Sequence, residues 1–180
     1  MSNGIILWEN RTIVCIATGF KRPSTNRKTG PMIQTYIIRR DMHPLEAIST
    51  GKDSTICGDC VHRGRKGKKR SCYVQVGKSV SRVYDCYRGG GYENNWTYDI
   101  FMGTKVRAGA YGDPAYVPFT IWRNIHEAAI GMTGYTHRWK KQFAQGYKKY
   151  FQASVDTTSE LEQAWEMGWN TFRVKPKGTK

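Results

Sequence analysis

Residues 106–114 read VRAGAYGDP, a short apolar run that ends in Gly-Asp-Pro. The run predicts a buried strand, and the final triplet predicts the turn that ends it. The same alternation then continues along the chain: helix 119–130, strand 132–136, a helix through 139–143, strand 151–155, helix 159–168 and strand 170–174. Strands and helices in this order are typical of a parallel α/β sheet. We therefore predict an α/β fold, either a partial (β/α) barrel or an open parallel sheet.

The chain upstream of this repeat is rich in β-branched and apolar residues. Residues 12–19 and 32–40 predict two strands, and residues 71–76 predict a third. A length of 180 residues suits one domain with a single core. That domain divides into three parts: a β-rich part with a cysteine-containing metal loop (1–76), a βα-repeat part (77–174) and a basic tail (175–180).

Polar side chains follow the predicted strands of the repeat. Asp113 follows the first, His137 the second and Asp156 the third. In parallel α/β folds, ligands bind outside the carboxyl ends of the strands. We therefore expect Asp113 and His137 at this edge, as candidates for a catalytic group or a metal ligand. The structural alternatives are a helix cap for either aspartate and a hydrogen-bonded structural role for His137.

Three cysteines form the most informative local motif. Two residues separate Cys57 from Cys60 in Cys-Gly-Asp-Cys, and eleven residues separate Cys60 from Cys72. Two intervening residues, one of them glycine, let the chain turn so that both thiols point at one metal centre. A third thiol leaves room for one further, exchangeable ligand. We predict that Cys57, Cys60 and Cys72 bind a metal centre.

The identity of that centre stays open between an iron–sulfur cluster and zinc, because both bind thiolates. Addition of His62 to the three cysteines would complete a closed, four-ligand zinc site. Two observations favour a cluster of the [4Fe–4S] type. The loop belongs to a larger α/β domain rather than to a small independent finger, and three cysteines with one open position are typical of clusters with a reactive iron.

The other two cysteines have simpler interpretations. Cys15 lies in the apolar run 13–17 and predicts a buried thiol, while Cys86 is either a structural thiol on a helix or a fourth ligand. An odd total of five, without a recognisable signal peptide, favours reduced thiols over disulfides. No apolar run is long enough to cross a membrane. We expect a cytoplasmic protein without a membrane partner.

The charge of the chain favours a polyanionic partner. Lys and Arg number 29 against 14 Asp and Glu, a formal net charge of +15. Basic surfaces attract polyanions, of which nucleic acid is the commonest in a cell. Within the cysteine loop, Arg65, Lys66, Lys68 and Lys69 are the candidate nucleic-acid contacts. The alternative is a solvated basic surface without a specific partner.

Several enzyme classes lack their motif in this chain. The sequence contains no Walker A motif, no G-x-S-x-G, no G-x-G-x-x-G and no H-E-x-x-H. It therefore gives little support to an NTPase, an α/β-hydrolase or a zinc protease of the H-E-x-x-H type.

A set of motifs in fixed order resembles a known family. The motifs span 57–60, 72–74, 107–114, 134–139, 153–156 and 171–174. Together they resemble a family of small bacteriophage proteins and, more distantly, are similar to the phage gene-product-88 family. That family shares a cysteine cluster, a Gly-Asp pair after a strand and a Tyr-Thr-x-x-Trp segment. The match covers most of the chain from Asn26 to Val174.

The resemblance implies a phage origin and a partial, radical-SAM-like barrel with a cysteine-held cluster at its mouth. It carries Cys57, Cys60 and Cys72 over as cluster ligands and makes S-adenosylmethionine a candidate cofactor. The chain departs from the Cys-x-x-x-Cys-x-x-Cys loop of standard radical SAM enzymes and is too short for a full barrel. Cys86 falls where relatives are expected to have small residues.

Together these observations predict a phage iron–sulfur protein with redox or cluster-dependent chemistry on an unknown substrate. Its expected location is the cytoplasm of the infected bacterial host. The alternative is a zinc-stabilised nucleic-acid-binding phage protein that acts in replication or host takeover. A third interpretation is a phage inhibitor with a purely structural metal. Nucleic acid and a host protein are the candidate partners.

Overall fold

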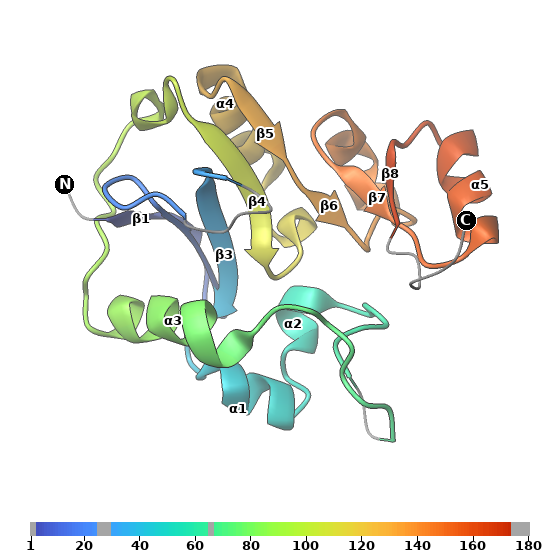
Figure 1. The fold of residues 1–180 in the computed structure, drawn as a ribbon, viewed down its shortest axis with the longest axis horizontal. Coiled ribbons are helices and arrows are strands. Elements are labelled where there is room, and N and C mark those ends of the chain that lie inside the picture. Colours follow the sequence, from blue (N-terminus) through green and yellow to red (C-terminus); the bar gives the residue numbers. More distant parts are fainter. Residues whose placement is uncertain (1–2, 25–29, 65–66, 174–180) are drawn as a thin grey trace.

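The computed structural model describes residues 3–24, 30–64 and 67–173. These residues form a five-stranded sheet, β1-β2-β3-β4-β5, and a three-stranded sheet, β6-β7-β8 (Figure 1). The strands are β1 (Gly4–Glu9), β2 (Ile13–Thr18), β3 (Ile33–Arg39), β4 (Lys105–Tyr111), β5 (Gly131–Thr133), β6 (Tyr135–Thr136), β7 (Gln152–Ser154) and β8 (Thr171–Phe172). The α-helices are α1 (Pro44–Ser49), α2 (Ser54–Cys57), α3 (Ser81–Arg88), α4 (Phe119–Ala128) and α5 (Thr158–Glu166).

The larger sheet is mixed rather than entirely parallel. Strands β1, β2 and β3 are antiparallel neighbours, whereas β3, β4 and β5 are parallel. Strands β6, β7 and β8 are also parallel, and Gly134 links β5 to β6. The described strands do not close into a barrel. The predicted α/β class is confirmed, with an open mixed sheet.

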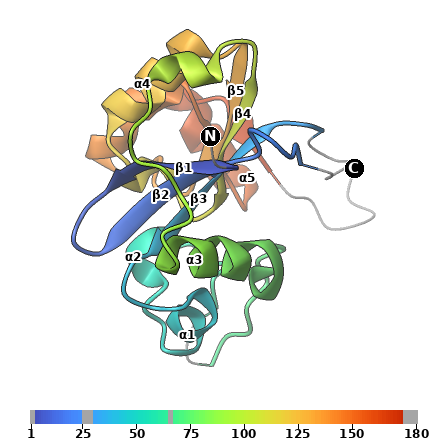
Figure 2. The ribbon, with the colours of Figure 1, turned by 90° about the vertical axis from the view of Figure 1, so that its left-hand side faces the viewer.

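The core lies where apolar strands are covered on both faces. Strands β2 and β3 are buried along almost their whole length, which explains their near-continuous apolar sequence. Helices α1, α2 and α3 gather together below the larger sheet (Figures 1 and 2). Trp122 of α4 is fully buried, and its indole N–H donates to the carbonyl of Pro114 at 2.9 Å. No helix among the described residues is long and apolar enough to cross a membrane.

Three local predictions differ from the structure. Strand β1 is not among the predicted strands. Its sequence lacks the polar alternation by which a half-buried strand is identified. Residues 71–75 have no regular structure, and a π-helical turn (Val76–Val80) leads into α3. A 3₁₀ helix (Gln142–Lys149) replaces the helix expected through 139–143. The predicted basic tail, 175–180, lies outside the described residues.

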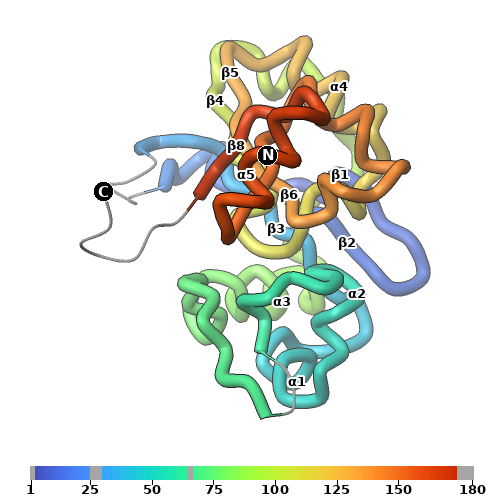
Figure 3. Tube along the Cα trace, turned by 90° about the vertical axis from the view of Figure 1, so that its right-hand side faces the viewer, coloured from blue at the N-terminus to red at the C-terminus, as the bar shows by residue number. Residues whose placement is uncertain are grey.

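The parallel strands place their carboxyl ends on the side of the cysteine segment. Strands β3 and β4 run towards α2 in Figure 1. Figure 3 shows helices α1 to α3 together at the bottom of the view, with β6, β8 and α5 above them. Segments far apart in the sequence therefore meet beyond the ends of β4, β6 and β7.

Candidate metal centre

A glycine shapes the carboxyl end of β4. Gly112 has a φ of +76°, and a Cβ there would lie 2.5 Å from the carbonyl oxygen of Ile37 in β3. Left-handed backbone of this kind, in so close an approach, requires glycine. The resulting turn buries Asp113 at the sheet edge.

Asp113 joins the end of β4 to the end of β6. Its Oδ1 accepts hydrogen bonds from Thr136 Oγ1 at 2.6 Å and from the N–H of Ala115 at 3.0 Å. Its Oδ2 accepts one from the N–H of His137 at 2.8 Å. Burial raises the pKa of Asp113, and these hydrogen bonds act in the opposite direction. Both carboxylate oxygens are therefore engaged within the protein.

Two contacts dock the Cys-Gly-Asp-Cys turn against the same strand ends. The N–H of Asp113 donates to the carbonyl of Ile56 in α2 at 2.7 Å. Arg138, which follows β6, donates from Nη1 to Asp59 Oδ1 at 2.7 Å. Gly58 makes this approach possible, because a Cβ there would lie 2.6 Å from the Arg138 guanidinium.

Backbone hydrogen bonds hold the segment of Cys72 close to that of Cys57 and Cys60. The N–H groups of Ser71 and Cys72 donate to the carbonyl of His62, at 3.1 and 2.9 Å. The N–H of Cys60 donates to the carbonyl of Cys57 at 3.2 Å. The basic segment between Cys60 and Cys72 is thus closed at its base.

A buried ion pair holds the start of the loop. Arg63 donates from Nη2 and Nε to Asp53 Oδ1, at 2.7 and 3.2 Å. Both side chains are buried, with Asp53 only 1% exposed. Arg63 also donates to the carbonyl of Gly51. Because loss of one partner of such a pair costs about 3–5 kcal/mol, the position of this loop is strongly specified.

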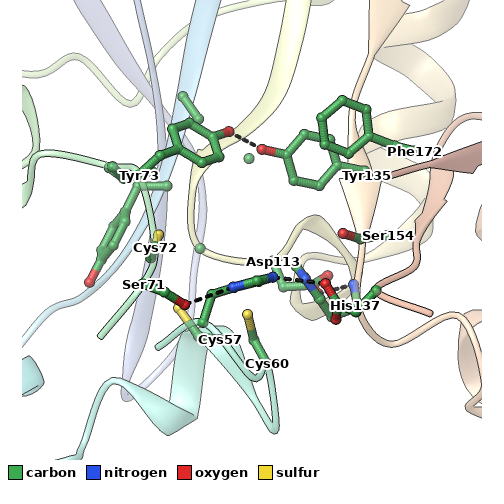
Figure 4. Close-up of a pocket in the computed structure, with 17 residues that line it drawn as sticks. Cys57, Cys60, Ser71, Cys72, Tyr73, Asp113, Tyr135, His137, Ser154 and Phe172 are labelled. Carbon is green, nitrogen blue, oxygen red and sulfur yellow. Dashed lines mark hydrogen bonds and ion pairs between the residues drawn. The ribbon is translucent and has the colours of Figure 1, made fainter. Parts of the chain in front are cut away.

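A cavity of about 170 Å³ lies where these segments meet (Figure 4). The three thiols of Cys57, Cys60 and Cys72 line it, together with Asp113 and His137. In Figure 4 the cysteines lie on one side of the cavity and His137 on the other. The structure therefore brings all five of these predicted site residues to one place.

The buried thiols do not have the properties of free nucleophiles. Burial raises the pKa of the Cys57 thiol, and it raises that of Cys60 to about 11. A backbone hydrogen bond from His62 to Cys60 acts in the opposite direction. At neutral pH such thiols are protonated and react slowly, whereas binding of a metal would displace their protons. The arrangement suits metal ligation better than covalent catalysis.

His62 and Asp156 line the cavity as a pair that the sequence does not reveal. His62 Nε2 lies 2.8 Å from Asp156 Oδ1, and its Nδ1 lies 2.9 Å from Ser71 Oγ. The sequence suggests a zinc ligand at His62, and for Asp156 a place at the strand ends or a helix cap, but it does not relate the two residues. The cap of α5 is instead Thr157, whose hydroxyl accepts from the N–H of Glu160 at 3.1 Å.

Two buried polar atoms of the cavity lack a hydrogen-bond partner among the described residues. They are the hydroxyl of Tyr111 and Nε2 of His137. Burial lowers the pKa of His137, so its imidazole is neutral at pH 7 and able to bind a metal. Because buried polar atoms are normally paired, these two atoms are available to bond to a group within the cavity.

Aromatic side chains line the end of the cavity away from Cys60. Tyr135 stacks on Phe172 with ring centroids 4.6 Å apart, and its hydroxyl bonds to that of Tyr73. Arg107 Nη2 donates to the Tyr73 hydroxyl at 2.8 Å. Figure 4 shows Tyr73 and Tyr135 reaching towards each other from opposite sides.

The other cysteines lie elsewhere. All five are free thiols, so the expectation of reduced cysteines agrees with the structure. Cys15 is fully buried in β2, as predicted. Cys86 is exposed on α3 and does not line the cavity.

The predicted basic contacts are only partly described. Lys68 and Lys69 are exposed and lie outside the cavity lining. Arg65 and Lys66 fall outside the described residues. The structure therefore gives Lys68 and Lys69 no role in the cavity.

Comparison with known proteins adds no relative. No protein-family model, curated protein or solved structure matches the chain. The resemblance to phage families thus remains a prediction from the sequence motifs.

Proposed function

We propose that the protein binds an iron–sulfur cluster of the [4Fe–4S] type through Cys57, Cys60 and Cys72. The observation that carries this proposal is the convergence of the three thiols on one cavity. The orphaned hydroxyl of Tyr111 suits a bound group with acceptor positions. The donor set therefore fits a cluster with three thiolate ligands.

The spacing of the thiols favours a cluster over a single zinc ion. Among the described residues, the sulfurs of Cys57, Cys60 and Cys72 do not form a group in which all three atoms lie within 4.8 Å of one another. Tetrahedral zinc, with Zn–S bonds of about 2.3 Å, requires sulfurs roughly 3.8 Å apart. In a [4Fe–4S] cluster each thiolate binds a different iron, so the sulfurs stand further apart.

The chemistry would take place at the carboxyl edge of an open, partial barrel formed by β3 to β8. A bound cluster would supply or accept one electron, and three thiolates leave one iron with an exchangeable position. S-adenosylmethionine is the candidate ligand for that position, on the strength of the radical-SAM-like resemblance. The aromatic wall at Tyr135 and Phe172 would limit access of water to the bound group.

The biological setting proposed here is a bacteriophage protein in the cytoplasm of the infected host. Its support is the ordered set of cysteine, Gly-Asp and Tyr-Thr-x-x-Trp motifs. The proposed substrate is a phage or host component, so a host protein is a candidate partner.

Metal analysis distinguishes an iron–sulfur cluster from a zinc ion at the three cysteines. Protein purified without oxygen is expected to be brown and to contain about four iron atoms and four sulfides per chain. It should lose its visible absorption on exposure to air or chelator. Colourless protein without iron or sulfide would contradict the proposal. One zinc per chain that Cys72→Ala abolishes would establish the zinc alternative.

A second candidate function, nucleic-acid binding, is favoured by a basic groove. The groove has a volume of about 760 Å³ and is lined by Lys78, Arg82 and Arg107. No Asp or Glu occurs among its described lining residues, and no ion pair joins these three cations to a described carboxylate. Cations without a described carboxylate partner, beside tyrosines such as Tyr36 and Tyr92, are typical of surfaces that bind single strands.

Removal of the groove charges is expected to weaken binding of a single-stranded oligonucleotide. In the variant Lys78→Gln/Arg82→Gln/Arg107→Gln, three phosphate contacts are lost. The slope of log affinity against log salt should therefore become shallower by about 2. Fluorescence anisotropy between about 50 and 200 mM salt measures this slope.

The loop variant Lys68→Gln/Lys69→Gln is the matched control for this experiment. It removes exposed charge outside the groove, so the salt slope should change less. A larger effect of the loop variant would assign the phosphate contacts to the cysteine loop. Wild-type binding without any salt slope would exclude phosphate contacts at either surface.

A further inference from the structure

A second set of ligand-type side chains lies in the cavity, separate from the thiols. One ligand atom from each of His62, His137 and Asp156 lies within 4.8 Å of the other two. All three residues are partly buried and line the cavity. They come from the cysteine loop, from the residue after β6 and from the segment after β7. The fold alone therefore creates this group.

Hydrogen bonds outside the group hold the first histidine in a ligating orientation. His62 Nδ1 bonds to Ser71 Oγ at 2.9 Å, which directs Nε2 towards Asp156 Oδ1 at 2.8 Å. A histidine that binds a metal through one ring nitrogen commonly bonds through the other to a fixed polar group. Ser71 has this position relative to His62.

The other two residues are held by the backbone. The N–H of His137 donates to Asp113 Oδ2 at 2.8 Å, which fixes the start of its side chain at the end of β6. The N–H of Asp156 donates to Glu160 Oε2 at 2.8 Å, which fixes Asp156 against the first turn of α5. Nε2 of His137 is buried without a partner among the described residues. Hydrogen bonds therefore fix the backbone of both residues, and Nε2 of His137 is free to bind a ligand.

We propose that His62, His137 and Asp156 bind one divalent first-row transition-metal ion, such as Zn²⁺ or Fe²⁺. Two imidazoles and one carboxylate are a donor set typical of mononuclear sites that keep open coordination positions. Bonds of about 2.0–2.2 Å to such an ion place ligand atoms roughly 3–4 Å apart, so only small side-chain rotations are needed. Binding through Nε2 would require the neutral tautomer of His62 that carries its proton on Nδ1, where it donates to Ser71 Oγ.

The ion would have a function distinct from that of the proposed cluster. Its open positions face the cavity, where they would bind an oxygen or nitrogen atom of a molecule held between the thiols and the aromatic wall. The site depends on none of the three cysteines for a ligand. It can therefore be tested whether or not the cluster proposal is correct.

Cobalt binding to a cysteine-free cavity tests the site. The variant Cys57→Ala/Cys60→Ala/Cys72→Ala, stripped of metal with EDTA, is expected to bind one Co²⁺ per chain. Its visible spectrum should show weak ligand-field bands without the intense near-ultraviolet band of a cobalt–thiolate bond. Adding His137→Ala or Asp156→Ala to this background should abolish binding, and adding Ser71→Ala should weaken it about tenfold.

A matched histidine variant and a second background make the result decisive. His126→Ala, on the exposed side of α4, should leave cobalt binding unchanged. If the triple-cysteine variant does not fold, His137→Ala and Cys72→Ala are compared in the wild-type chain with Co²⁺. His137→Ala should then remove one equivalent without thiolate character, and Cys72→Ala should retain it. A folded triple variant that binds no Co²⁺ would overturn the proposal, as would cobalt bound only with a thiolate band.

Discussion

Replacement of Cys57, Cys60 or Cys72 by alanine is expected to abolish incorporation of iron and sulfide. The three thiols line one cavity, and neither of the other two cysteines reaches it. Loss of one ligand leaves two thiolates, which are too few to retain the cluster. Iron and sulfide content, with visible absorption after reconstitution without oxygen, measures the effect.

Cys86→Ser and Cys15→Ala are the matched controls for these variants. Cys86 is exposed on α3, and Cys15 is buried in β2. Both should retain the full iron content, although Cys15→Ala should lower the free energy of unfolding by about 1 kcal/mol because it leaves a small void. Full iron and sulfide in Cys72→Ala would remove Cys72 from the ligand set.

Asp113→Ala is expected to lower the free energy of unfolding by about 3–5 kcal/mol. The carboxylate is buried and accepts hydrogen bonds from Thr136, Ala115 and His137. Alanine leaves all three donors unpaired beside a void, and it releases the end of β6 from the end of β4. Urea denaturation followed by tryptophan fluorescence gives the change.

Two further aspartate variants distinguish the hydrogen bonds from a general effect of charge. Asp113→Asn preserves the shape and one acceptor oxygen, so its loss should be intermediate. Asp99→Ala removes an exposed carboxylate and should change stability by less than about 0.5 kcal/mol. A loss below about 1 kcal/mol in Asp113→Ala would mean that these hydrogen bonds do not hold the two strand ends together.

Much of the local structure could be predicted because local patterns report burial. The apolar run of β4 and its Gly-Asp-Pro turn lie where the sequence places them, as do β7, α4 and α5. The mixed sheet could not be predicted in the same way. Burial on both faces gives one apolar pattern whether the neighbouring strand is parallel, as β4 is to β3, or antiparallel, as β2 is to β3.

The candidate site also combines features that are local in the sequence with contacts that only the tertiary structure creates. The Cys-x-x-Cys spacing and the positions of Asp113 and His137 after strands are local features, so the sequence identifies them as candidates. The contact between Arg138 and Asp59 spans 79 residues, and the contact between His62 and Asp156 spans 94. No periodicity in the chain relates such distant positions.

The amino-acid sequence by itself determined the α/β alternation, the buried strands and the thiol pair that a glycine turn presents. Only the tertiary structure decided which strand ends meet and that His62 joins His137 and Asp156 in one cavity. The physical reason is the range of the interactions. Turn geometry and side-chain periodicity act over a few residues, whereas the site arises from the docking of the cysteine loop on strand ends through Asp113 and Arg138.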